Sequence, residues 1–394
     1  MITKFEKVNS HLIYASLIAL AIGLMTSVSV LALSHIFIAI PCLYYLSKVD
    51  YKKFSKSSIA LLLLAIVIVL SVLVNQDVAV LGFKPISKSK YFFFGFLMIA
   101  PFTFYFKSLF NNKKIKILLY LFCISSLIAT ISGYIGMKTG YNFLLRRGVA
   151  LDRNAGLTGH VLNYAHNLAS FQIIIFGLIL YHKQIKEFIS KKFLIIVFII
   201  NLFGIYTSYT RGALLALMLA LPFYFFKKNK KNFLIACAAI GFIGSSVVFV
   251  AGNTIIRSGS DNERVSQWQA AAKAFEERPI LGYGFLNFEQ NSLQIKKRYS
   301  LPEPNYPGHA HNNFMEILAT TGIVGFICFI AWIGFWLKEM YLRDDIIAKV
   351  SFVFILVFLA SGMTQSTISL GVNLFFIMAV YALSQVNPKL LKVQ

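Results

Sequence analysis

Charged residues are scarce in this sequence, and acidic residues are the scarcest. Only 13% of its 394 residues are charged, and 15 acids stand against 38 lysines and arginines. Soluble domains carry roughly 25% charged residues, so that class is excluded. Hydrophobic residues make up 58% of the chain and gather in runs of about 20, each able to cross a hydrocarbon core of about 30 Å. The sequence therefore predicts an integral membrane protein.

Cysteine is rare as well, and the cysteines are not spaced as in disulfide frameworks or metal sites. The four cysteines fall inside apolar runs without a C-x-x-C pair, which argues against a disulfide framework or a cysteine-based metal site. The sequence also has no P-loop or nucleotide-binding fingerprint. We therefore expect no metal and no cofactor. The cysteines are Cys42, Cys123, Cys237 and Cys328.

The apolar runs predict an all-α polytopic protein with about twelve transmembrane helices in one membrane domain over residues 1–394. The run 11–47 is too long for one span and divides near 27–34. The last run, 350–386, divides near 365–369. The other spans are expected at about 57–75, 91–106, 117–137, 161–181, 193–209, 212–226, 233–251 and 312–337.

Lysine and arginine are distributed differently. Most lysines lie in short clusters that place both termini in the cytoplasm by the positive-inside rule, so the net charge of +23 needs no nucleic-acid partner. The long loops 138–160 and 252–310 then face the other side, which is the periplasm in a diderm bacterium. Every arginine except Arg343 is predicted to lie on this same side of the membrane. Since arginine grips phosphate or carboxylate with a planar fork, we expect an anionic ligand, unless these arginines bind lipid headgroups or the loops' own acids.

Arg211 is the most specific single candidate for a ligand-binding residue. It separates two apolar runs with no loop, and the following run, 213–226, is short for a full span. Arg211 should therefore lie below the outer surface and face the protein interior. Burial at that depth costs about 2.5–3.5 kcal/mol, so the side chain needs a partner. The neighbouring spans contain almost no acids, which favours a ligand phosphate over a structural ion pair.

The second long loop contains an amphipathic helix. Apolar residues recur with a period of about 3.6 over residues 261–275, Asp261 suits the N-cap, and the helix should end before Arg278. Such a helix can lie flat on the membrane surface and roof a cavity. Arg264, near its start, could reach an anion there; the alternative is plain surface packing.

Histidines stand at the start of the tenth predicted span, in the segment 308–316 (GHAHNNFME). His311 and Asn312 lie near a helix N-terminus, which attracts anions. His309 and His311 are two residues apart, not the four that place two metal ligands on one helical face. A general base fits better, because a neutral imidazole can take a proton from a hydroxyl near neutral pH. The alternative is a helix start with interfacial histidines.

Other residues are weaker candidates. His160 and His166 open the sixth predicted span on the same side, and they could line the same cavity, but we favour an interfacial position for both. Arg147 lies in the first long loop. Tyr283 lies in a Gly-Tyr-Gly segment that predicts a tight turn.

Taken together, these motifs resemble the O-antigen ligase / Wzy polymerase superfamily. The order and spacing of the motifs agree, and the resemblance covers mainly residues 200–335. The similar segments are His309–Glu316 with Gly322 and Gly325 (H-x-H-N…E…G-x-x-G), 279–284 (P-x-L-G-x-G), Arg264 with Trp268 (R-x-x-x-W), and 208–212 (S-x-x-R-G).

This resemblance implies a metal-independent GT-C-type glycosyltransferase in the bacterial inner membrane. The donor would be a glycan on undecaprenyl diphosphate, and the acceptor in the ligases is a sugar of lipid A–core. By motif, His311 would deprotonate the acceptor hydroxyl, while Arg211 and Arg264 would bind the donor diphosphate. Supporting roles are expected for His309, Asn312, Arg147 and Tyr283.

The compact length and the H-x-H-N form favour an O-antigen ligase of lipopolysaccharide biosynthesis. The nearest alternative is an O-antigen polymerase, which uses the same donor with a second lipid-linked glycan. A protein O-oligosaccharyltransferase ranks third. A secondary transporter can also have about twelve spans, but here the charges gather at one face and the two halves show no repeat.

Overall fold

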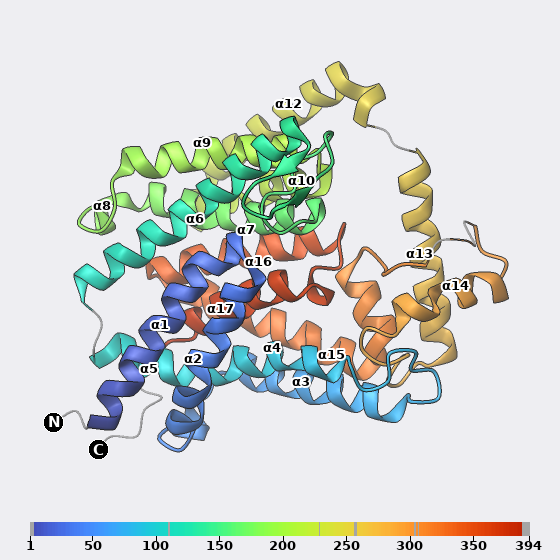
Figure 1. Ribbon diagram of the computed structural model, residues 1–394, viewed down its shortest axis with the longest axis horizontal. Helices are drawn as coiled ribbons and strands as arrows, with labels where there is room; N and C mark the ends of the chain where they lie inside the picture. The colour runs from blue at the N-terminus through green and yellow to red at the C-terminus, as the bar shows by residue number, and fades with distance from the viewer. Residues whose placement is uncertain are drawn as a thin grey trace.

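The computed structural model describes residues 4–108, 111–227, 229–255, 258–302, 305 and 307–387. These residues are mostly helical, and the long helices lie side by side (Figure 1). The elements are α1 (Lys4–Thr26), α2 (Val28–Leu46), η1 (Tyr51–Lys53), α3 (Lys56–Val74), α4 (Ile86–Leu97), α5 (Ile99–Ser108), α6 (Asn112–Thr139), β1 (Tyr141–Asn142), β2 (Arg147–Gly148), α7 (Val161–Leu180), α8 (His182–Ile185), α9 (Lys191–Thr207), α10 (Arg211–Ala220), α11 (Phe223–Phe226), α12 (Lys230–Ile255), α13 (Ser258–Glu277), α14 (Phe288–Arg298), α15 (Asn313–Leu342), α16 (Ile346–Gly362), η2 (Thr367–Ser369) and α17 (Gly371–Ser384).

The all-α polytopic architecture is confirmed. Within the described residues, seven helical segments are long and apolar enough to cross a membrane, with α4 and α5 counted as one, and three shorter apolar segments accompany them, with α10 and α11 counted as one. Each predicted span coincides with one helix or with two consecutive helices. The count of twelve spans and the GT-C type stay predictions.

Breaks in the apolar runs follow local chemistry. The division of the first run falls at Ser27, whose side chain caps α2, and that of the last run falls between α16 and α17, as predicted. Two predicted spans are each split into two helices. The break between α4 and α5 falls at Met98, because Pro101 in the first turn of α5 cannot donate to the carbonyl of Leu97. Pro222 stands between α10 and α11.

The polar loop helices lie at one end of the molecule. The start of α1 lies at the left end in Figure 1, whereas α13 and α14 lie at the right end, and α13 runs across the direction of α3 and α15. The helix predicted over 261–275 is therefore present and roofs the bundle end. Its packed side includes Ala270, Ala271 and Ala274, which contact the cluster around Ala319 of α15, whereas Val265 is 47% exposed.

One detail of that helix was predicted wrongly. Asp261 is not the N-cap, because α13 begins at Ser258 and Asp261 lies in its first turn. The carboxylate is consequently free of a capping role and points to another helix, as described below.

The tenth predicted span is a broken helix. Within α15, Gly322 has φ 62° and ψ −163°, a conformation that is essentially restricted to glycine. The segment 279–284 fills the break: the N–H of Ile323 donates to the carbonyl of Pro279 at 2.8 Å, and a Cβ on Gly322 would collide with the carbonyl of Ile280. The two glycine-containing motifs are therefore halves of one structural joint.

The first long loop is tied to the bundle. It contains the two-stranded hairpin β1–β2. Farther along, the N–H of Asn154 donates to the carbonyl of Thr207 at the end of α9 (3.0 Å), and the Asn154 amide donates to the Thr130 carbonyl of α6 (3.3 Å). These bonds hold the neighbouring Arg153 beside the start of α10.

Candidate active site

A polar pocket of about 170 Å³ lies where α13 covers the bundle. It is built from distant parts of the chain, and three arginines and one glutamate give its lining a net positive charge at neutral pH. The lining residues are Arg153, Leu162, His166, Tyr209, Thr210, Arg211, Gly212, Glu263, Arg264, His311 and Thr364. The pocket thus contains Arg211, Arg264 and His311, the three residues predicted to carry the chemistry.

Arg211 is the first residue of α10, just after a strained bend. Tyr209 in that bend has φ 51°, and the Ser208 hydroxyl accepts the N–H of Thr210 at 3.2 Å. The structural ion pair that we considered less favoured than a ligand phosphate is present: Nη2 of Arg211 lies 3.3 Å from Oδ1 of Asp261. The acid comes from α13, not from a neighbouring span, so sequence proximity could not reveal it.

The Arg211–Asp261 pair is partly open to solvent. The two side chains are 36% and 47% exposed, and exposed ion pairs contribute at most about 1 kcal/mol. An incoming phosphate can therefore replace the carboxylate at modest cost.

Arg264 is half-buried and has a different environment. No hydrogen bond or ion pair to its guanidinium is found within the part of the chain that the structure describes. Burial lowers the pKa of Arg264, while the nearby Asp261 carboxylate opposes that shift. A half-buried cation without a direct anionic partner is costly, so this guanidinium is available to an external anion.

Arg153 is a pocket arginine that sequence reasoning did not single out. Its Nε donates to the Ser208 carbonyl at 2.8 Å and its Nη2 to Thr210 Oγ1 at 3.1 Å. These bonds hold the guanidinium over the bend that precedes Arg211. No motif marked it, because it is one of three arginines in the first loop and only the docking of that loop on α9 selects it.

His311 lies in the polar turn before α15, with φ 48°. Its Nδ1 is 2.8 Å from Oε1 of Gln365, and its ring meets that of His309 edge-on with centroids 4.1 Å apart. Burial, helped by the nearby His309 and Arg264, lowers the pKa of His311 to about 4. The imidazole is therefore neutral at physiological pH and can accept a proton.

Three other candidate residues lie outside the pocket. Asn312 caps α15 by accepting the N–H groups of Phe314 and Met315 (2.9 and 3.2 Å). Tyr283 is buried and donates its hydroxyl to Glu277. Arg147 is exposed in β2. None of the three lines the pocket, so the supporting roles suggested for these residues stay predictions.

His166 lies inside the protein and not at the membrane interface, where we expected it. It is 2% exposed on α7 and lines the pocket. Its Nδ1 has no hydrogen-bond partner within the described ranges. His160, by contrast, is exposed at the start of α7 and is not a lining residue.

Glu316 stabilises the turn that contains His309 and His311. It is 1% exposed, and its Oε2 accepts the N–H of Ala310 at 2.8 Å. Since Ala310 stands between the two histidines, this bond sets the course of the turn. In the described part of the chain, no group of three or more His, Cys, Asp or Glu is placed to hold a metal ion.

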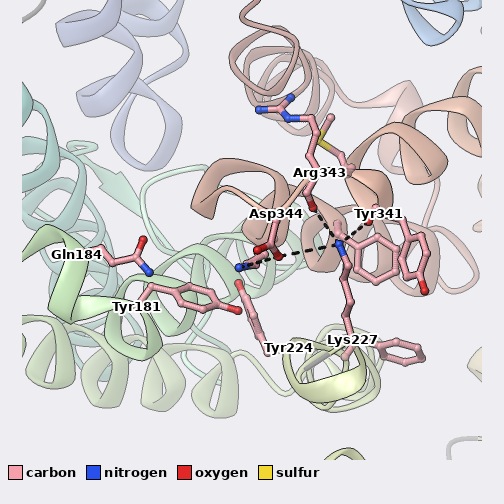
Figure 2. Close-up of a pocket in the computed structure, with 11 residues that line it drawn as sticks. Tyr181, Gln184, Tyr224, Lys227, Tyr341, Arg343 and Asp344 are labelled. Carbon is pink, nitrogen blue, oxygen red and sulfur yellow. Dashed lines mark hydrogen bonds and ion pairs between the residues drawn. The ribbon is translucent and has the colours of Figure 1, made fainter. Parts of the chain in front are cut away.

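Another cavity, of about 330 Å³, lies at the opposite end of the bundle (Figure 2). Its cations are already engaged. Lys227 donates to the carbonyls of Tyr341 (2.9 Å) and Arg343 (3.2 Å), and Asp344 lies 3.0 Å from Lys349. Because these groups satisfy one another, the smaller arginine pocket is the better site for an external anion.

The structure therefore defines a multi-pass helical membrane protein with a cationic, histidine-containing pocket at one end of its bundle. Residues 196–330 match the family model described as O-antigen ligase (Wzy_C). This match confirms the resemblance to the O-antigen ligase / Wzy polymerase superfamily, and the matched segment includes Arg211, Arg264 and His311. Arg153 and Gln365 lie outside it. A comparison with curated proteins finds no match.

Proposed function

We propose that this protein is an O-antigen ligase, which transfers a glycan from undecaprenyl diphosphate to a sugar hydroxyl of lipid A–core at the periplasmic face of the inner membrane. The observation that carries the proposal is the guanidinium of Arg264, which has no hydrogen-bond or ion-pair partner among the described residues, in one pocket with Arg153, Arg211 and a neutral His311. Such a pocket supplies positive charge for a diphosphate and a base for a hydroxyl.

The reaction needs one proton transfer and one bond exchange. His311 takes the proton of the acceptor hydroxyl, and the oxygen attacks the anomeric carbon of the donor sugar. The bond between that carbon and the diphosphate oxygen breaks, and its electron pair leaves with undecaprenyl diphosphate. The arginines stabilise the negative charge that grows on this leaving group, so no acid has to protonate it.

The position of the pocket suits two lipid-anchored substrates. It lies at the bundle end beneath α13, and its lining includes residues near the starts of α7 and α10. A diphosphate anchored in the membrane can therefore meet the arginines while its polyprenyl chain stays in lipid. Holding both substrates at this boundary contributes to the rate by removing their relative motion.

The test uses purified protein in liposomes with undecaprenyl-diphosphate glycan, with and without lipid A–core. Transfer to core by the wild type, reduced about 10²–10⁴-fold in His311→Ala, is the expected result. His11→Ala is the matched control, because His11 is exposed on α1, and it should retain wild-type transfer.

Other outcomes contradict the ligase assignment in different ways. Longer lipid-linked chains formed without core would indicate an O-antigen polymerase. No transfer to either acceptor from folded protein would reject both, and transfer to a protein acceptor would then identify a protein O-oligosaccharyltransferase.

A further inference from the structure

Gln365 lies beside the histidines although it is 54 residues farther along the chain. It stands in the break between α16 and α17, and it is 1% exposed. Its backbone is fixed on both sides: its N–H donates to the Ser361 carbonyl at 3.0 Å, and its carbonyl accepts the N–H of Thr367 at 2.9 Å. The side chain therefore projects from a rigid turn.

The amide of Gln365 bridges both rings. Its Oε1 lies 2.8 Å from Nδ1 of His311, and its Nε2 lies 3.4 Å from Nε2 of His309. An amide oxygen can only accept and an amide nitrogen can only donate. In this orientation His311 must carry a proton on Nδ1, and His309 must leave its Nε2 bare.

The opposite orientation of the amide has the opposite consequence. It would donate to Nδ1 of His311 and accept from Nε2 of His309, so that both rings would carry their proton on Nε2. The His311 ring could then not take a proton, because its only free nitrogen would be bound to the amide. The two orientations thus predict tautomers that an experiment can distinguish.

We propose that Gln365 is a positioning residue that holds His311 in its Nδ1–H tautomer, leaving Nε2 as the atom that takes the acceptor proton. The tautomer follows from the orientation of the amide in the structure, with Oε1 toward His311, whereas the role of Nε2 rests on the proposed function. A carboxylate often holds a catalytic imidazole in this way. A neutral amide holds the tautomer without adding negative charge, so the ring keeps the low basicity that its burial imposes.

Two substitutions separate this role from a merely structural one. Gln365→Leu removes both hydrogen bonds at similar size, and we expect kcat to fall about 10²-fold or more with little change in KM. Gln365→Glu keeps an acceptor for Nδ1–H and adds a negative charge, which favours the protonated ring. We expect it to retain most of the transfer while the acid limb of its pH profile moves to higher pH.

The control is Gln184→Leu, which removes an amide at the opposite end of the bundle and should leave both kcat and the pH profile unchanged. Equal losses in Gln365→Leu and Gln365→Glu, with an unmoved acid limb, would mean that Gln365 only supports the fold. Wild-type kcat and an unchanged profile in Gln365→Leu would also overturn the proposal.

A spectroscopic measurement tests the tautomer without any reaction. Wild-type protein with ¹⁵N-labelled histidine is placed in lipid bilayers, and the His311 signals are identified by their loss in His311→Ala. Protonated Nδ1 and bare Nε2 at pH 7 are expected. Protonation at Nε2 would reject the proposal even if glycan transfer occurs, and absence of transfer would reject the proposed function but not the tautomer.

Discussion

The arginines of the long loop 252–310 differ in whether they pair with an acidic residue. Arg278 pairs with Asp77 and contacts Asn75 (2.9 Å), and Arg298 lies 2.7 Å from Glu277. Arg264 has no such partner in the described residues. An arginine that pairs within the protein stabilises the loop, whereas one that is half-buried and unpaired is available for a ligand.

Replacement of Arg264 should therefore affect transfer and not stability. We expect Arg264→Ala to lower kcat/KM for donor about 10²–10³-fold, as loss of one group that stabilises developing charge does, with an unchanged melting temperature. Arg298→Ala, an exposed and internally paired arginine, is the control and should leave transfer near wild type. A fall in Arg298→Ala equal to that in Arg264→Ala would show that net charge alone matters.

The buried environment of His311 makes a prediction about pH. Its pKa is lowered to about 4, first by burial, and the base works only when neutral. The acid limb of kcat/KM, which reports the free enzyme, should therefore lie below pH 6.5, the value of an unperturbed histidine. Measured profiles of wild type in liposomes check this, and an acid limb above pH 6.5 would contradict it.

At the scale of single elements, the break in α15 decides where the site residues lie. The helix segment before Gly322 carries the histidine turn at its start, while the segment after it packs in the bundle with Trp332 and Trp336 stacked 5.8 Å apart. The segment 279–284 joins the two and also connects them to α13. The site therefore depends on a joint that lies outside the pocket.

Substitution at this joint should lower both stability and transfer. Gly322→Ala places a Cβ where the backbone conformation is restricted to glycine, at a cost of about 1–3 kcal/mol, and against the Ile280 carbonyl. We expect a lower melting temperature and a large loss of transfer. Gly334→Ala is the control in the same helix, because a Cβ there meets no atom within 4 Å. An unchanged melting temperature in Gly322→Ala would show that the joint adapts.

At the scale of the whole molecule, the two ends differ in charge and in loop structure. The lysine-rich turns between α2 and α3 and around α8 lie at the end where α1 starts, and α13, which contributes residues to the arginine pocket, lies at the other end (Figure 1). The positive-inside rule predicts that the lysine-rich end faces the cytoplasm.

Cysteine labelling checks this orientation. In a variant without native cysteines, Leu144→Cys, at a residue that is 61% exposed in the hairpin loop, should react with a membrane-impermeant maleimide in right-side-out vesicles. Lys52→Cys, exposed in η1 at the lysine-rich end, should react only after permeabilisation. The reverse pattern would place the pocket in the cytoplasm and remove the ligase proposal.

The amino-acid sequence was sufficient to predict the helical membrane architecture, because apolar runs of bilayer length have few alternatives once the backbone must satisfy its hydrogen bonds internally. It also indicated the loop helix and marked Arg211, Arg264 and His311, since charged or titratable groups at helix ends need a reason to be there. The partners of these residues could be identified only in the folded protein. Asp261 reaches Arg211, Arg153 docks through Ser208, and Gln365 meets the histidines, because each contact joins segments far apart in the chain. No local period or propensity encodes such distances.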